Sequence, residues 1–207
     1  MKIQPIVEGH GDVAAVPVLL RRLIAQSGAF DLGVGRPILW KHHHLLRQDS
    51  LKKAVRLAKM QGDCAAILVL FEDEDDCPKT LGPKLSDWVR NEAGEVPCAV
   101  VLAHREYETW FLAAIESLRG RRGIRLDAEA PPDPEAIRGA KEAIGRQMQK
   151  GYTYMETTDQ PALSDSLDFR EAYSRSRSFR HLVTAFGKLL DGLGKKPQEW
   201  PPSNWAS

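Results

Sequence analysis

Carboxylate side chains gather at three places in the sequence where an apolar run ends. Glu8 follows residues 3–7, the acidic run 72–76 follows residues 65–71, and Glu106 and Glu108 follow residues 96–103. Carboxylates that lie close together repel one another, so at neutral pH they either take up protons or bind a cation. Mg²⁺ is bound by a few hard carboxylate oxygens and keeps water molecules for a substrate phosphate. The three groups therefore predict a divalent-metal site.

The apolar runs before these carboxylates have the pattern of buried strands. Residues 65–71 (AAILVLF) are continuously apolar, as expected of a strand covered on both faces. Residues 34–40 predict an edge strand, because Gly35 and Pro37 disfavour a central position. Apolar residues at helical spacing predict helices over 13–24, 50–60, 80–91 and 106–118. This alternation predicts an α/β fold, a mostly parallel Rossmann-like sheet flanked by helices, with ligands at the carboxyl ends of its strands.

The character of the sequence changes after Leu118. A basic, glycine-broken stretch is followed by the linker-like residues 127–134, a predicted helix over 134–148 and an irregular polar segment over 151–161. Apolar residues at helical spacing return from Phe179 to Leu193. We therefore expect an α/β domain over residues 1–118 and a helical C-terminal extension over 119–207 that packs on it as a cap.

Bulk composition narrows the class of protein. The chain has 207 residues, 43% of them hydrophobic, and a formal net charge of +1, which is typical of a globular protein and gives no general reason for nucleic-acid or membrane binding. We find no apolar run long enough to span a bilayer and no signal peptide. The three cysteines are too few and too scattered for a disulfide framework, which favours a cytoplasmic location.

Three motifs in order resemble a known superfamily. They are Val7-Glu8-Gly9 after the first strand, Asp75-Asp76-Cys77-Pro78 at the end of the acidic run, and Arg105-Glu106-Tyr107-Glu108-Thr109-Trp110 after the last strand. Together they resemble the Toprim domain of topoisomerases, primases and OLD-type nucleases, and more closely a small bacterial family of unknown function allied to it. The likeness covers about the first 115 residues in order, and the helical remainder more loosely.

This resemblance implies Mg²⁺- or Mn²⁺-dependent cleavage of phosphodiester bonds. Glu8 would be a general base or a metal ligand, and Glu106 and Glu108 would complete a second metal site or position a base. The expected catalytic residues are Glu8, Asp73, Asp75 and Glu106, and the expected metal ligands are Glu8, Asp73, Asp75, Asp76 and Glu108. Bound metal would contact the scissile phosphate and lower the pKa of an attacking water.

The register of the acidic motif has two alternatives. Asp73 and Asp75 would point the same way in an extended segment and reach one metal ion. If Cys77-Pro78 anchors the comparison instead, the acidic pair falls on Glu72 and Glu74. Asp12 could add a further carboxylate, although it is also placed to cap a helix.

Basic side chains predict contact with a phosphate backbone. The expected nucleic-acid-binding residues are Lys41, Arg105, Arg121, Arg122, Arg175 and Arg177. Adjacent histidines of a strand point to opposite faces, so in the run His42-His43-His44 only the first and third could bind one metal ion. No cysteine or further histidine lies at zinc-site spacing, which favours a loop or substrate-facing position near the ligand edge of the sheet. The resemblance also implies a role in phage defence or a mobile element beside a separate ATPase protein, and a homodimer is a further expectation. The alternatives are a small-molecule phosphohydrolase and a non-catalytic protein-interaction module.

Overall fold

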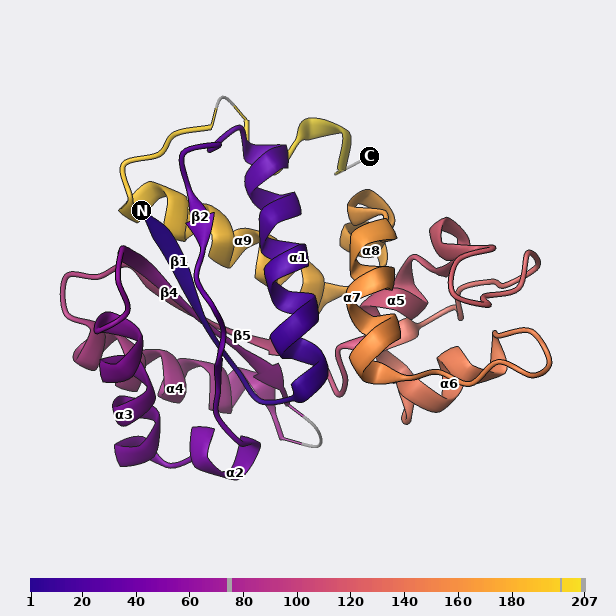
Figure 1. The fold of residues 1–207 in the computed structure, drawn as a ribbon, viewed down its shortest axis with the longest axis horizontal. Helices are drawn as coiled ribbons and strands as arrows, with labels where there is room; N and C mark the ends of the chain where they lie inside the picture. The colour runs from indigo at the N-terminus through magenta and orange to yellow at the C-terminus, as the bar shows by residue number, and fades with distance from the viewer. Residues whose placement is uncertain (74–75, 198, 206–207) are drawn as a thin grey trace.

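The computed structural model describes residues 1–73, 76–197 and 199–205, and within them it contains one parallel sheet (Figure 1). The strand order is β2-β1-β4-β5. β3 also pairs with β1, at its carboxyl end, whereas β2 pairs with its amino end. All described pairs are parallel. The strands are β1 Lys2–Val7, β2 Gly33–Val34, β3 Ile38–Leu39, β4 Cys64–Glu72 and β5 Cys98–Ala103. The predicted α/β fold with a mostly parallel sheet is confirmed.

Helices cover both faces of this sheet (Figure 1). One face carries α1 (His10–Ser27) and α9 (Arg177–Gly192), and the other carries α3 (Gln48–Lys59) and α4 (Pro78–Ala93). The remaining helices are α2 His42–Leu45, α5 Glu108–Ala113, α6 Ala140–Arg146, α7 Glu156–Ser166 and α8 Phe169–Arg175, with 3₁₀ turns at Ile115–Leu118, Pro134–Ala136 and Ser203–Trp205. No helix in the described ranges is long and apolar enough to cross a membrane.

Side chains of the central strands alternate between the two faces. In β4, Leu68 and Leu70 pack on the α1 side, while Val69 and Phe71 pack on the α3–α4 side. Successive strand residues point to opposite faces, so this alternation continues to the strand's carboxyl end. The alternation therefore determines toward which face of the sheet the first residues of the acidic run point.

The predicted edge strand is divided into two short strands. β2 and β3 pair with the two ends of β1, and residues 35–37 lie between them. Pro37 has no backbone N–H to give to a strand partner. Gly35 lies so close to Gln4 that a Cβ at this position would be 2.1 Å from the Gln4 amide oxygen. Both residues explain why the edge is interrupted.

Two other expectations about elements were wrong. The helix expected over 134–148 is a 3₁₀ turn followed by α6, because Gly139 has a positive φ of 69° and breaks the helix. The segment 151–161, expected to be irregular, contains the start of α7. Its buried polar residues Asp159 and Gln160 hid the helical periodicity that apolar residues normally reveal.

The helical C-terminal region completes the core on the α1 face. Phe179 and Phe186 of α9 and Leu163 of α7 belong to the same apolar cluster as α1 and β4. Trp110 packs edge-on against Phe179, with ring centroids 5.5 Å apart. The C-terminal region therefore also supplies side chains to the sheet's carboxyl edge.

Candidate functional site

Glu8 and Glu72 meet where the direction of the chain through the sheet reverses. From β1 the chain passes through α1 to β2 and β3 on one side, and then through α2 and α3 to β4 on the other side. Open α/β sheets bind ligands at such a switch point, because the connections leave a crevice at the carboxyl ends of the strands. Glu8 follows β1 and Glu72 ends β4, and the Glu8 Oε1 accepts a 2.6 Å hydrogen bond from the backbone N–H of Glu72.

His42 fixes the second oxygen of Glu8. Its Nδ1 lies 2.6 Å from the Glu8 Oε2, and its ring packs edge-on against Phe71. All three histidines of the run lie in the short helix α2 rather than in an extended segment. The first of them, His42, contacts Glu8. Both oxygens of Glu8 are thus held in place.

Asp73 points away from Glu8. It is fully buried, its Oδ1 accepts from the Arg105 backbone N–H at 2.7 Å, and its Oδ2 lies 2.9 Å from the His104 Nδ1. Glu72 instead accepts from the Tyr107 N–H at 3.0 Å and faces Lys141. The alternation of β4 thus favours the register with Glu72 at the Glu8 side. Glu74 and Asp75 lie outside the described residues.

Helices contribute three further carboxylates beside Glu8 and Glu72. Asp12 of α1 is buried and accepts from the Gly9 N–H and from the Gln160 amide. Glu108 of α5 is fully buried, with its Oε1 accepting from the Tyr154 hydroxyl at 2.6 Å. We call this set the carboxylate site; it consists of Glu8, Asp12, Glu72, Glu108 and Glu156, with Lys141 among them.

Negative charge exceeds positive charge in the carboxylate site. Burial, with the nearby Glu108 and Glu8 charges, raises the pKa of Glu72 to about 9 against the opposing effect of Lys141. Burial raises the pKa of Asp12 to about 7 and that of Glu108 to about 7. Burial alone would lower the pKa of Lys141, yet Glu108, Glu72 and Glu156 raise it above its ordinary value. Near neutral pH, therefore, Glu72 is protonated, and Asp12 and Glu108 are each about half protonated.

The other predicted acidic residues lie beside this set. Glu106 caps α6, because its Oε2 accepts from the Lys141 backbone N–H at 2.9 Å. Asp76 is exposed, and its backbone N–H donates to the Asp73 carbonyl. Within the described ranges, no three histidine, cysteine, aspartate or glutamate side chains converge as a ready set of metal ligands.

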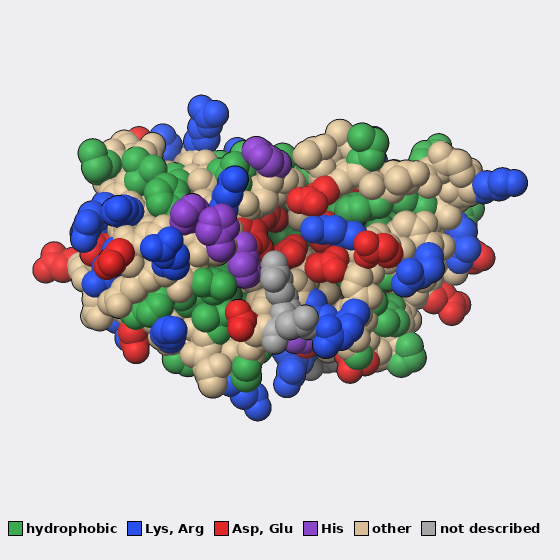
Figure 2. All heavy atoms as spheres, turned by 90° about the horizontal axis from the view of Figure 1, so that it is seen from below, with side chains coloured by type: hydrophobic (Ala, Val, Ile, Leu, Met, Phe, Trp, Pro, Cys, Tyr) green, Lys and Arg blue, Asp and Glu red, His purple; other side chains and the backbone are tan. Residues whose placement is uncertain are grey.

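A basic groove is lined by the chain neighbours of His42, the residue that contacts Glu8. It has a volume of about 920 Å³, and its walls come from the segment leading into α2 and from α3. Its basic and aromatic residues include Lys41, Arg47, Lys53, Trp40, His43 and His44. Partial burial lowers the pKa of His44, and the neighbouring charges of His43, Arg47 and Lys41 add to this effect. On the carboxyl face of the sheet, acidic side chains are flanked by histidine and basic side chains (Figure 2).

The predicted nucleic-acid-binding arginines do not form one surface with Lys41. Arg122 pairs with Asp159 at 2.6 Å, and Arg175 pairs with Glu116 at 2.7 Å, so both stabilise the helical region. Arg121 is exposed in the turn after Leu118. Arg105 lines a cavity with Glu72 and Lys141, and Arg177 lines a different one with His104.

Four residues of the site's surroundings were missed from the sequence: Lys141, Tyr154, Glu156 and Gln160. Lys141 lies in α6, Tyr154 lies between α6 and α7, and the other two lie in α7, so all four are far from the strands in sequence. One signal was present. Gly9-His10-Gly11 allows α7 to approach α1 so closely that a Cβ on Gly11 would lie 2.2 Å from the Gln160 Oε1.

Comparison with known proteins identifies the family. No curated protein and no solved structure matches the chain. A family model does match, over residues 7–187, and this range begins at the last residue of β1 and includes β4, β5 and the helices that supply Lys141 and Glu156. The chain therefore belongs to the family described as domain of unknown function DUF4276.

Proposed function

We propose that this protein is a Mg²⁺- or Mn²⁺-dependent phosphodiesterase that acts on nucleic acid at the carboxylate site. The observation that carries the proposal is the bond from the Glu72 backbone N–H to the Glu8 carboxylate at the switch point of the sheet, beside the Glu72 carboxylate whose pKa the Glu8 charge helps to raise. The adjacent basic groove, with Lys41, Arg47 and Lys53, supports a polyanionic substrate.

The chemistry of the site suits a divalent cation. The Glu108 Oε2 is buried and has no hydrogen-bond partner among the described residues, and Glu72 keeps a proton that a cation would displace. Mg²⁺ commonly binds through one or two carboxylates and retains several waters, so Glu8 and Glu72 would suffice as its protein ligands. When bound, such an ion polarises a phosphate oxygen and makes a bound water more acidic.

The chain's own residues then have separate roles. His42 and the Glu72 N–H fix the orientation of the Glu8 carboxylate. Lys141 offsets part of the negative charge and pairs with Glu156 at 3.3 Å. Residues of the basic groove bind the phosphate backbone on the α2 side and position the scissile phosphate by the switch point.

A cleavage and metal-binding assay tests this proposal. Wild-type protein is incubated with DNA and RNA, with and without Mg²⁺ or Mn²⁺, and Mn²⁺ binding is followed by electron paramagnetic resonance. We expect Glu8→Gln and Glu72→Gln to lose both cleavage and Mn²⁺ binding, whereas Glu92→Gln, which alters the α3–α4 ion pair with Arg56, keeps both. Cleavage that survives either substitution at the site would contradict the mechanism, and turnover of phosphate esters without polynucleotide cleavage would favour a small-molecule phosphohydrolase.

A further inference from the structure

A second cavity opens on the α4 side of the sheet's carboxyl edge. It has a volume of about 300 Å³, which is at the small end of the range for small-molecule sites. We call it the His104 cavity. It lies between the first turns of α4 and the N-terminal turns of α9, and it shares no lining residue with the carboxylate site.

His104 is oriented toward this cavity by a buried carboxylate. The Asp73 Oδ2 is bonded to the His104 Nδ1 at 2.9 Å, and the Asp73 Oδ1 is held by the Arg105 N–H at 2.7 Å. A carboxylate at Nδ1 fixes the ring's tautomer and orientation, which leaves Nε2 for another partner. The described part of the chain provides no hydrogen bond to that Nε2.

The carboxylates that line the cavity are already engaged. Glu135 accepts at Oε1 from the Ser178 N–H at 2.7 Å and from the Ser176 hydroxyl at 2.9 Å. Its Oε2 lies 3.4 Å from the Arg177 Nε. Both acidic side chains thus bond to the chain itself, and the cavity's exposed cationic groups are those of Lys79 and Arg177.

The lining also has an apolar part. Pro78, Gly82 and Leu102 contribute it, and Gly82 lies one turn after Lys79 on the same face of α4. A Cβ built on Gly82 meets no atom within 4 Å, so the space beside this helix is open. An apolar surface with a few convergent polar groups at its rim is typical of a small-molecule site.

We propose that the His104 cavity binds a single nucleotide unit, with the phosphate near Lys79 and Arg177, the His104 Nε2 as a further polar contact, and the apolar body over Gly82 and Leu102. Lysine and arginine supply charge-assisted hydrogen bonds to phosphate. The ligand is either a free nucleotide or the phosphorylated end of a nucleic-acid strand, since the phosphate and base are the same in both. This inference does not depend on metal binding at Glu8 and Glu72.

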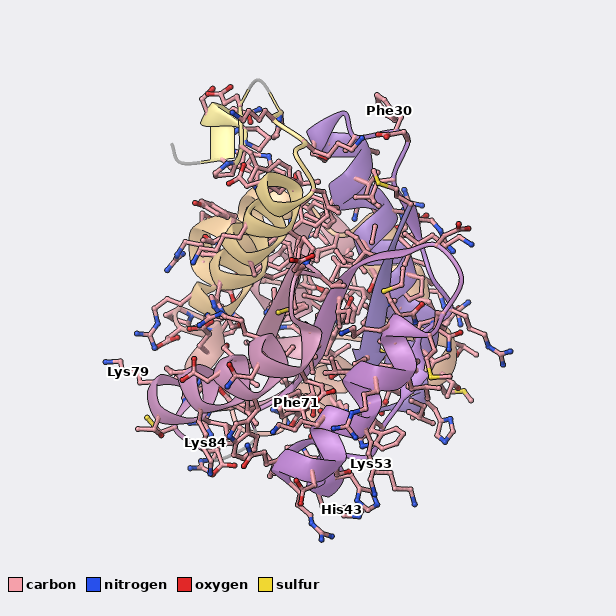
Figure 3. The ribbon with its side chains drawn as sticks, turned by 90° about the vertical axis from the view of Figure 1, so that its left-hand side faces the viewer. Phe30, His43, Lys53, Phe71, Lys79 and Lys84 are labelled. Atoms are coloured by element: carbon pink, nitrogen blue, oxygen red, sulfur yellow. The ribbon has the colours of Figure 1, made fainter. Side chains whose placement is uncertain are left out.

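Calorimetric titration with AMP and with inorganic phosphate tests the site. We expect wild-type protein to bind AMP more tightly than phosphate. Gly82→Leu should abolish AMP binding by filling the cavity, while Gly145→Leu, at an open helical position in α6, should leave it unchanged. Lys79→Gln should weaken binding about tenfold or more, because a charge-assisted hydrogen bond is lost. Lys84→Gln is the matched control, since Lys84 lies on the same helix as Lys79 (Figure 3). Its Nζ lies over the Trp88 ring, 4.9 Å from the centroid.

Two further experiments distinguish a free nucleotide from a strand end, and the His104 cavity from the carboxylate site. An oligonucleotide with a 5′-phosphate that competes with AMP, when its 5′-hydroxyl form does not, assigns the cavity to a strand end; failure to compete assigns it to a free nucleotide. Glu8→Gln should bind AMP as the wild type does, so failure of the carboxylate-site proposal would not affect this result. No AMP binding at millimolar concentration, equal binding by Gly82→Leu, or phosphate binding as tight as AMP would overturn the proposal.

Discussion

At the residue scale, the neighbours Glu72 and Asp73 differ in what surrounds them. Asp73 is fully buried and accepts two hydrogen bonds, from the Arg105 N–H and at His104. We predict that Asp73→Asn lowers the free energy of unfolding by about 1–3 kcal/mol, because a neutral amide makes weaker hydrogen bonds than the carboxylate does. Urea denaturation measures this effect, and Mn²⁺ binding should persist in the folded variant.

The control is Asp87→Asn on α4. Asp87 is exposed and pairs with Arg90 one turn later, so its removal should change stability by less than about 0.5 kcal/mol. If Asp73→Asn instead abolished Mn²⁺ binding without loss of stability, the ligand register would be Asp73/Asp75 after all.

The site could be predicted from the sequence only in part, for a reason visible at Glu72. The carboxyl ends of strands are readable from apolar runs, so Glu8 and the acidic run were found. The face toward which each acidic residue points depends on which strand residues point to which side of the sheet. In a run that is apolar throughout, the sequence does not show which residues these are. The packing of Leu70 and Phe71 on opposite sides supplies it.

At the element scale, the approach of α7 to α1 determines which side chains reach the sheet's edge. A Cβ on Gly11 would lie 2.6 Å from the Glu156 Cγ and 2.2 Å from the Gln160 Oε1. We predict that Gly11→Ala destabilises the protein by about 1–3 kcal/mol, because the Glu156 and Gln160 side chains must leave their positions and the Gln160 bond to Asp12 is disturbed. Thermal denaturation measures the change.

Gly145→Ala in α6 is the matched control for Gly11→Ala. Its Cβ would meet no atom within 4 Å, so it should stabilise the protein by about 0.5–1 kcal/mol through helix propensity alone. Equal gains at both positions would show that α1 and α7 are not in close contact in solution.

Elements built from apolar periodicity were predictable, and those built from polar contacts were not. The strands and α9 bury continuous or periodic apolar residues. In α7, by contrast, Asp159 bonds to Arg122 and Gln160 to Asp12, so two of its buried positions carry polar residues. Contacts of this kind form only after distant segments fold together, and they leave no local signal.

At the scale of the whole molecule, the carboxylate site couples folding to pH. Asp12 and Glu108 each have a folded pKa of about 7, above the ordinary values of 3.8 and 4.5. The folded state therefore holds more protons than the unfolded state between about pH 4 and pH 7. The stability associated with these two protons is fully present below pH 4 and is lost as the pH rises through 7.

We accordingly predict that the double variant Asp12→Asn/Glu108→Gln gains stability over the wild type at pH 8, on the order of a few kcal/mol, and gains little at pH 5. Urea denaturation of both proteins at pH 5 and pH 8 gives the difference in free energy of unfolding at each pH. Titrating groups that the two proteins share contribute equally to both and cancel in this difference. Glu95→Gln, at an exposed position, should show the same small effect at both pH values. A double variant whose advantage does not grow with pH would mean that Asp12 and Glu108 are not held in a proton-binding cluster, and the excess negative charge that favours a cation at Glu8 and Glu72 would then be absent.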